Sequence, residues 1–230
     1  MSPSSAGRAA TAQIFPPAAD TSLRLTMILL ALAIAMLGIG GWARVRSPWE
    51  TQEGLAEHQP VPFSHKHHVG DSGIDCRYCH TSVETSARAG LPATHICMTC
   101  HSQLWTGAEM LAPVRKSMAT RRPLVWHRVA QVPDYVYFNH SIHVARGVGC
   151  VECHGRIDKM PLTWRAKPFQ MQFCLDCHRD PGPHLRPPQL VTQMEPLGWS
   201  EAEKRRYGER VMAAHRIDPK TLTNCEMCHR

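Results

Sequence analysis

One continuous apolar segment dominates the pattern of polar and hydrophobic positions along the chain. No residue from Met27 to Ala43 is charged, and this run lies at the short end of the range for a membrane-spanning helix, about 17–25 residues. The apolar part of a signal peptide is shorter, about 7–15 residues. We therefore predict a transmembrane anchor at residues 26–45 after a disordered cytoplasmic leader at residues 1–25. A cleaved signal peptide is the alternative.

Clear helical patterning reappears in one later segment. Ser200 and Glu203 have the spacing of a capping box, which predicts a helix over residues 201–215. One face of this helix is predicted to carry Tyr207, Val211 and His215. Elsewhere the chain has 18 prolines, 15 glycines and only 7% aromatic residues. We therefore expect a mainly α-helical fold with much irregular coil, joined to the anchor by a tether at residues 46–62.

The cysteines form a repeated motif that can explain the small number of apolar residues. All ten fall in five copies of Cys-x-x-Cys-His, a spacing typical of covalent c-type haem attachment. The histidine after the second cysteine then binds the iron on its proximal side. The predicted attachment residues are Cys76, Cys79, Cys97, Cys100, Cys150, Cys153, Cys174, Cys177, Cys225 and Cys228. The predicted proximal ligands are His80, His101, His154, His178 and His229.

Zinc knuckles and disulfides are the competing interpretations of these cysteines. A zinc site does not need a histidine after every second cysteine, and a disulfide framework would not repeat one local spacing five times. Five covalent haems are therefore favoured, and their porphyrins would serve as the core of a multihaem cytochrome c fold. Their propionates would reduce the formal charge of +7 to about +2. The basic composition consequently gives no reason to expect a nucleic-acid partner.

An internal repeat supplies candidates for the second axial ligands of the irons. Phe-x-His-x-x-His occurs at residues 63–68 and again at 138–143, each time shortly before a pair of haem motifs. Two imidazoles three residues apart lie on one side of a helical turn and can bind two different haems. The predicted distal ligands are His65, His68, His140 and His143. The repeat divides the chain into a first dihaem module with its connector (63–137), a second dihaem module (138–190) and a C-terminal helix with the fifth site (191–230).

The fifth iron has two tentative candidates for its distal ligand. Met171 begins the string before the fourth haem motif, and a thioether ligand raises the haem potential. His215 lies on the predicted helix before the last motif. Both residues have ordinary alternative roles, as a core-filling methionine and a core histidine, so the choice stays open.

Several of these strings carry a family resemblance. The Phe-x-His-x-x-His element before a haem motif resembles the class III multihaem cytochromes. Residues 136–141, 153–155, 171–179 and 222–230, together with the anchor and the haem number, resemble the pentahaem membrane-anchored cytochrome c subunit of alternative complex III. The resemblance covers about residues 25–230. A quinone reductase complex of sulfate reducers has a similar subunit, and the sequence leaves both complexes open.

This resemblance implies an electron-transfer subunit of a membrane quinol oxidoreductase that is not catalytic alone. Its expected partners are an iron-sulfur/molybdopterin-like subunit, quinol-binding multi-span subunits, and a periplasmic monohaem cytochrome c or terminal oxidase. Membrane lipid would contact the N-terminal helix. We expect a single-pass protein of the bacterial inner membrane, with a cytoplasmic N-terminus and a periplasmic haem domain. The alternative is a membrane-anchored multihaem quinol dehydrogenase that feeds a soluble periplasmic reductase.

Overall fold

The computed structural model describes residues 15–229, so most of the predicted leader lies outside the described residues. The chain divides into an N-terminal unit, Met1–Glu50, and a C-terminal unit, Thr51–Arg230. Within residues 15–229 the secondary structure is helical, and β pairing is limited to three isolated bridges. A mostly helical fold was predicted, and it is confirmed for this part of the chain.

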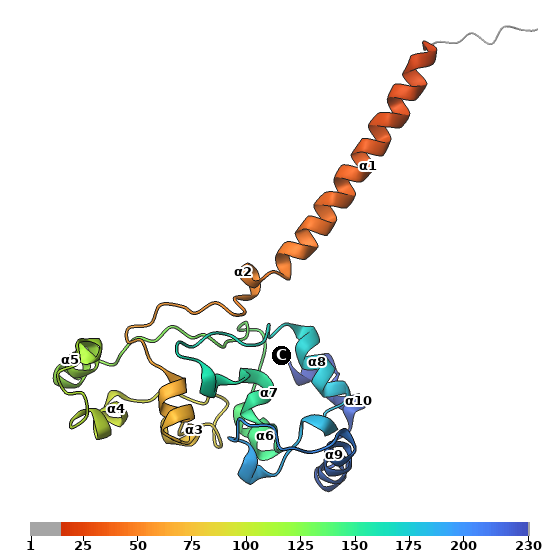
Figure 1. Ribbon diagram of the computed structural model, residues 1–230. Coiled ribbons are helices and arrows are strands. Elements are labelled where there is room, and N and C mark those ends of the chain that lie inside the picture. The colour runs from red at the N-terminus through yellow and green to blue at the C-terminus, as the bar shows by residue number, and fades with distance from the viewer. Residues whose placement is uncertain (1–14, 230) are drawn as a thin grey trace, which may run out of the picture. The chain divides into compact units, whose positions relative to one another are not determined.

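The N-terminal unit consists mainly of one long helix, α1 (Pro17–Val45), drawn in red and orange in Figure 1. Its 29 residues rise about 43 Å, more than the hydrocarbon thickness of a bilayer. The mean hydropathy of its most apolar window is 2.2, and none of that window is buried. This helix is long and apolar enough to serve as a single membrane anchor.

Helix α1 begins earlier than the sequence pattern indicated. The prediction of a disordered leader through residue 25 is wrong for residues 17–25, which are helical. Pro17 occupies the first turn, where a missing N–H costs no hydrogen bond. Asp20 lies in the same turn and pairs with Arg24 at 2.9 Å, and both features favour helix initiation.

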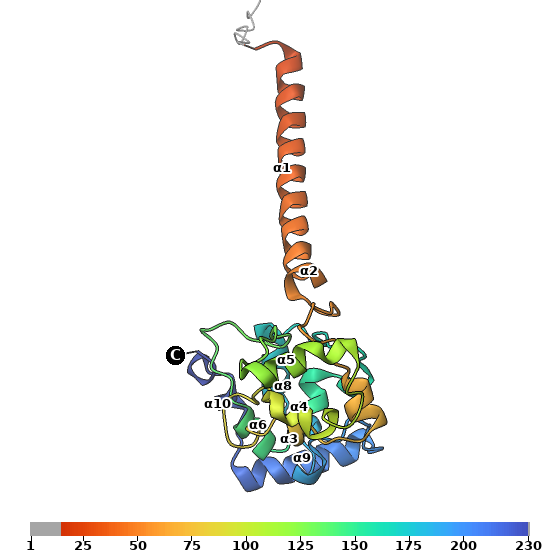
Figure 2. The same cartoon turned by 90° about the vertical axis from the view of Figure 1, so that its left-hand side faces the viewer.

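The C-terminal unit is built from short helical segments joined by coil, as Figures 1 and 2 show. The α-helices after the short α2 (Pro48–Thr51) are α3 (Cys76–Cys79), α4 (Thr94–His101), α5 (Ala112–Thr120), α6 (His140–Ala145), α7 (Cys150–His154), α8 (Met171–Arg179), α9 (Glu201–His215) and α10 (Pro219–Leu222). Between them lie a π-helix, η1 (Lys66–Asp71), and five 3₁₀ segments, η2 (Glu109–Leu111), η3 (Ile157–Lys159), η4 (Gly182–His184), η5 (Pro188–Leu190) and η6 (Cys225–Met227).

The protein core of this unit is small. Its only cluster of buried apolar residues consists, within residues 15–229, of Val61, Leu111 and Val114, packed against Cys97 and Trp126. This cluster holds α5 against α4. Most other side chains of the unit are partly exposed, so the short segments are held largely by hydrogen bonds between loops.

Helix α9 confirms the capping-box prediction. Ser200 accepts a hydrogen bond from the Glu203 backbone, and the Glu203 side chain accepts one from the Ser200 backbone. The buried residue of the helix is Gly208, whose backbone packs against Gly182 of η4. His215 is exposed. Helix α9 docks through Gly208, and His215 stays a prediction as a tentative distal ligand.

The segments of the C-terminal unit are arranged between two ends. Figure 1 shows α4 and α5 at one end, and α8, α9 and α10 at the other. Figure 2 looks at the unit from the α4 and α5 side. The order of the haem motifs between these two ends can therefore differ from their order in the sequence.

Candidate haem sites and their facing histidines

The five haem motifs fold locally into short helical turns. Helices α3 and α7 begin at the first cysteine of their motifs, whereas α4 and α8 contain their motifs at the C-terminal end. The last motif forms a single 3₁₀ turn, η6. Residues i and i+3 of a helical turn lie on the same side, so both thiols of each motif face one direction. None of the ten cysteines is joined to another in a disulfide.

The two Phe-x-His-x-x-His segments have the same internal geometry. In the first, the Phe63 ring contacts His65 edge-on at 4.9 Å and stacks on His68 at 4.4 Å. In the second, the Phe138 ring contacts His140 edge-on at 4.8 Å and His143 at 4.5 Å. One phenylalanine thus holds two imidazoles at fixed and different orientations in each repeat.

The same two segments differ in helix type. His140 begins the ordinary α-helix α6, whereas His65 precedes η1, whose π turns are wider. Gly70 in η1 makes the close contact that this geometry needs, because a Cβ there would lie 2.2 Å from the Asp158 carbonyl oxygen. Single π turns are frequent at functional sites.

Three of the predicted distal histidines face a predicted proximal histidine. The ring centroids of His68 and His101 are 6.1 Å apart, with planes at 67°. The His140 and His154 rings are 6.4 Å apart at 9°, and the His143 and His178 rings are 6.2 Å apart at 19°. Each pair joins a repeat histidine to the histidine of a haem motif.

These separations test whether the residues fit a haem iron. Two imidazoles that bind one metal ion from opposite sides, each through Nε2 at about 2 Å, have ring centroids about 6 Å apart. The separations of 6.1–6.4 Å agree with this value. The described residues contain no cluster of three or more metal-binding side chains. The donor set therefore fits paired axial ligation and not a zinc knuckle.

The fourth predicted distal histidine, His65, lies among imidazoles of two sites. Burial, and then the neighbouring charges of His80, His68 and His154, lower the pKa of His65 to about 4. Burial, followed by His140 and His80, also lowers the pKa of His154 to about 4. A neutral imidazole keeps one nitrogen lone pair available, as an axial ligand requires.

Hydrogen bonds fix the orientation of most of these rings. The Nδ1 atoms of His68, His80, His101, His140, His143, His178 and His229 all lie 2.7–3.2 Å from backbone carbonyl oxygens. His65 uses the Thr163 hydroxyl instead, at 2.8 Å. A carbonyl oxygen can only accept a hydrogen bond, so Nδ1 carries the proton in those seven rings. The Nε2 atom of each ring is then free to bind a metal ion.

The motif thiols show which sites are neighbours. The neighbouring Cys150 thiol, and then burial, raise the pKa of Cys76. Burial and then Cys97 raise the pKa of Cys79. Burial, and then the nearby Cys177 and Cys174, raise the pKa of Cys153 to about 12. Cys228 contributes, after burial, to the raised pKa of Cys174.

Hydrogen bonds between motifs support the same neighbours. The Tyr78 hydroxyl, inside the first motif, lies 2.8 Å from the Thr99 hydroxyl, inside the second. The His178 Nδ1 donates to the Leu222 carbonyl oxygen, just before the last motif, at 3.0 Å. The attachment sites therefore follow the spatial order Cys97, Cys76, Cys150, Cys174 and Cys225. The first two sites of the sequence are exchanged in space.

The fifth site differs from the other four. The ring beside His229 is that of Tyr135, at 5.9 Å and 27°, and the His229 Nδ1 lies 3.2 Å from the Tyr135 carbonyl oxygen. Met171, the first residue of α8, has 67% of its surface exposed. His215 is exposed at the end of α9. Within the part of the chain that the structure describes, neither tentative ligand contacts His229.

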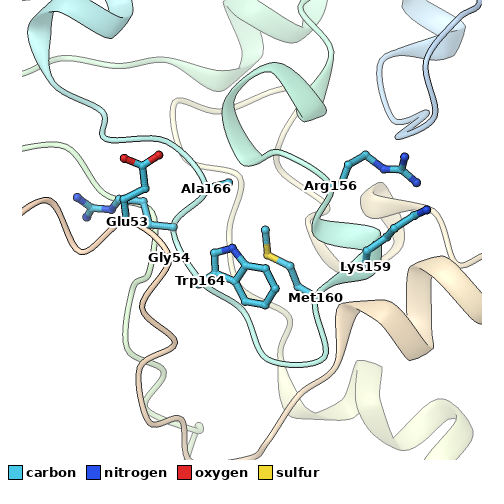
Figure 3. A pocket seen from close by; sticks show the side chains of 8 residues that line it. Glu53, Gly54, Arg156, Lys159, Met160, Trp164 and Ala166 are labelled. Carbon is cyan, nitrogen blue, oxygen red and sulfur yellow. The ribbon is translucent and has the colours of Figure 1, made fainter. Parts of the chain in front are cut away.

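A pocket of about 400 Å³ lies between the segments around Gly54, Met160 and Trp164, and Figure 3 shows its lining. Trp164 and the buried Met160 form its apolar wall. Two lining arginines are tied to neighbouring groups: Arg156 pairs with Asp158 and Glu195, and Arg165 donates to the carbonyl oxygens of residues 51, 129 and 131. Trp164 directly follows Thr163, the residue whose hydroxyl lies 2.8 Å from the His65 Nδ1.

Sequence analysis missed three residues of these sites. Thr163 orients His65, and Tyr135 lies on His229. Trp105 stacks on His67 at 5.1 Å and lies 6.1 Å from the His101 ring. None belongs to a motif, and each reaches its site through the folding of a loop. A tryptophan four residues after a haem histidine was the only local signal.

Taken together, the motifs, the helical fold and the facing imidazoles have the arrangement expected of a multihaem c-type cytochrome with covalently attached haem. No family model matches the chain. A segment of 126 residues is 34% identical to the menaquinone reductase, multiheme cytochrome c subunit, of Nitratidesulfovibrio vulgaris. This match covers 54% of the present chain, which in turn spans about half of that relative, 56%.

Proposed function

We propose that the protein is a pentahaem c-type cytochrome that serves as the electron-transfer subunit of a membrane quinol oxidoreductase. The complex would be of the alternative complex III type or of the menaquinone reductase type that the relative's name describes. Five covalent haems would supply reversible one-electron chemistry at the ten cysteines. The observation that carries this proposal is the series of motif sites in mutual contact, three of which face a second imidazole at 6.1–6.4 Å.

The chain's own residues would do three things in this function. Contacts between motifs, such as that of the Tyr78 and Thr99 hydroxyls, place neighbouring sites together, and Phe63 and Phe138 hold the distal imidazoles in two copies of one geometry. The carbonyl acceptors keep Nε2 directed away from the backbone. Filling both axial positions with imidazole leaves no coordination site for a substrate. Such sites are suited to transferring electrons and not to binding a reactant.

The pairs that we propose are His65 with His80, His68 with His101, His140 with His154, and His143 with His178. In this scheme the two histidines of each repeat serve two neighbouring sites, because the phenylalanine holds their rings in different orientations. The attachment sites then form one path in the order Cys97, Cys76, Cys150, Cys174 and Cys225. Its two ends are the sites that would exchange electrons with other proteins.

The location follows from the anchor and the attachment chemistry. Helix α1 would remain uncleaved as a single membrane span, with the N-terminus in the cytoplasm and the haem-bearing unit in the periplasm. Covalent haem attachment on the outer side of the bacterial cytoplasmic membrane supports this orientation. The partners would be an iron-sulfur/molybdopterin-like subunit, multi-span quinol-binding subunits and a monohaem cytochrome c or terminal oxidase.

Purification in mild detergent tests the proposed function. We expect the protein to be recovered with multi-span and iron-sulfur/molybdopterin-like subunits, and we expect the complex, but not the isolated subunit, to reduce its haems with menaquinol. Haem reduction by menaquinol in the isolated subunit would instead favour a quinol dehydrogenase that feeds a soluble reductase. Absence of covalent haem from the purified chain would contradict the whole proposal.

A further inference from the structure

The Cys97 end of the site series has a surface unlike the rest of the unit. After His101 the chain forms a loop that returns through η2 into α5, and this loop is tied to both helices. The His101 Nδ1 lies 3.2 Å from the Leu104 carbonyl oxygen, and Arg115 of α5 donates to the Ala108 carbonyl oxygen at 2.9 Å. Figure 1 places α4 and α5 together at this end. The loop therefore lies directly over the terminal site.

Large apolar side chains on this loop face solvent. The exposed fractions are 60% for Leu104, 56% for Trp105 and 56% for Met110. Trp105 also has a φ of 55°, a left-handed conformation that is unusual for a bulky residue and is found where a site requires it. Its indole stacks on His67 and lies beside His101. An apolar group is thus held on the outside of the Cys97 site.

Exposed cations without an ion pair among the described residues follow this loop, on α5 and at its C-terminus. Lys116, Arg121 and Arg122 of α5 and its C-terminus are exposed, and none forms an ion pair within residues 15–229. Residues 85–133 contain six Lys or Arg and one acidic residue, Glu109. Residues 200–229 at the other end also contain six Lys or Arg, but with five Asp or Glu. The segment directly after the Cys97 motif, residues 102–122, carries this excess in four Lys or Arg against one acidic residue.

We propose that this surface, defined by Leu104, Trp105, Met110, Lys116, Arg121 and Arg122, docks a redox protein whose contact face is acidic around an apolar centre. The inference rests on the proposed electron-transfer function and adds the place and chemistry of one partner. Exposed aromatic residues are enriched at the centres of protein interfaces, and charges at the rim steer association. One electron passes between the partner and the Cys97 site, so one centre is oxidised as the other is reduced.

The test uses the full-length holoprotein in detergent, reduced and then mixed with one of two oxidised probes. An acidic plastocyanin represents the proposed partner chemistry, and a basic mitochondrial cytochrome c represents the opposite. The variant is the triple charge reversal Lys116→Glu, Arg121→Glu and Arg122→Glu. The matched control reverses three exposed cations at the other end, Arg206→Glu, Arg216→Glu and Lys220→Glu. Arg121 and Arg216 both occupy a left-handed C-cap, so the two triples impose a similar local change.

We expect the Cys97-end triple to slow electron transfer to plastocyanin about tenfold or more at low salt. The control triple should slow it much less, and added salt should remove the difference. Transfer to the basic cytochrome should become faster in the Cys97-end triple. Trp105→Ala should slow transfer to plastocyanin even at high salt, with an unchanged haem spectrum showing that the His101 site is intact.

Two results would overturn the inference. Equal slowing by both triples would mean that only net charge matters, and stronger slowing by the control would place the acidic partner at the Cys225 end. The proposed function fails separately: in that case the wild-type protein, fully reduced by dithionite, would transfer electrons to neither probe. If only the docking inference fails, electron transfer to plastocyanin should stay fast and should not change in the Cys97-end triple.

Discussion

The four sites that belong to the repeat and the one that does not are built differently. In the proposed scheme each Phe-x-His-x-x-His segment brings two imidazoles to two motif histidines, so the repeat would supply four second ligands. The Cys225 site lies after the second module, and the ring beside its histidine is that of Tyr135. Ligation by two histidines would therefore be a property of the dihaem module and not of the Cys-x-x-Cys-His motif.

The two kinds of site also differ in their position along the series. The Cys150 site lies in the middle of the series, in contact with the Cys76 and Cys174 sites through the thiols. The Cys225 site is an end, linked through Leu222 to His178 alone among the motif histidines within residues 15–229. Removing a middle site and removing an end site should have different consequences.

The largest effect is expected from removing the middle site. In Cys150→Ala/Cys153→Ala the series is cut between the Cys76 and Cys174 sites, so electrons entering at one end should no longer reach the other. In the matched variant Cys225→Ala/Cys228→Ala the remaining four sites should still equilibrate rapidly. Mass spectrometry should show one haem fewer in each, and flash-photolysis reduction measures the transfer. Equally fast equilibration in both variants would contradict the proposed order.

Removing a facing imidazole should change one haem in five. His143→Ala takes away the ring 6.2 Å from His178, and we expect one site to become high-spin because one axial position opens. The matched control is His67→Ala, since His67 belongs to the same kind of segment but contacts Trp105. Electron paramagnetic resonance should show a new high-spin signal only in the first variant. A high-spin signal of equal size in the control would count against the pairing.

The wild-type protein should itself distinguish the fifth site. Because the described residues place no second imidazole at His229, we expect carbon monoxide to bind the reduced protein at one haem in five. The Cys225→Ala/Cys228→Ala variant should lose this binding. Difference spectroscopy during a carbon monoxide titration measures both. Complete resistance of the wild type would restore Met171 or His215 as the fifth distal ligand, and Met171→Ala and His215→Ala would show which.

The docking of α9 should affect stability but not the haem sites. A Cβ on Gly208 would lie 2.3 Å from the Gly182 carbonyl oxygen, so Gly208→Ala should destabilise the fold by about 1–3 kcal/mol through overpacking. Gly107→Ala is the control, because no atom lies within 4 Å of its added methyl. Thermal unfolding followed by circular dichroism compares them. Equal melting temperatures would show that α9 does not need this contact.

The smallest effect concerns pH. Arg77, which donates to Asp75 at 2.8 Å, lowers the pKa of that carboxyl to about 2. A carboxylate with a lowered folded-state pKa stabilises the protein above its ordinary value near 4, and this contribution is lost as the pH falls towards 2. Asp75→Asn should therefore cost about 0.2–1 kcal/mol at pH 6 and less at pH 3. A cost that grows at pH 3 would reverse the sign and contradict this account.

Sequence patterns predicted the local parts of this molecule well. The capping box at Ser200 and Glu203 is present as expected, because it depends on residues three positions apart. The phenylalanine and two histidines of each repeat form the same cluster for the same reason. The apolar run at Met27 predicted a long helix, although its first turns at Pro17 and Asp20 carry no hydrophobic signal.

The remaining features depend on residues far apart in the sequence. The exchange of the Cys76 and Cys97 sites in space arises because Cys76 meets Cys150, 74 positions later. Tyr135 reaches His229 across 94 residues, and His65 reaches Thr163 across 98. No local pattern encodes such contacts. The stripe on α9 likewise does not reveal that Gly208 forms the contact surface of the helix.

The order of the sites is the central claim, and a cryo-electron-microscopy map of the detergent-solubilised holoprotein tests it most directly. Each iron can be assigned to its cysteine pair from the covalent attachment visible in the map. We predict the order Cys97, Cys76, Cys150, Cys174 and Cys225, with each porphyrin beside only the next and with paired histidines on the first four. An iron order that follows the sequence, with the Cys97 haem between those of Cys76 and Cys150, would contradict it.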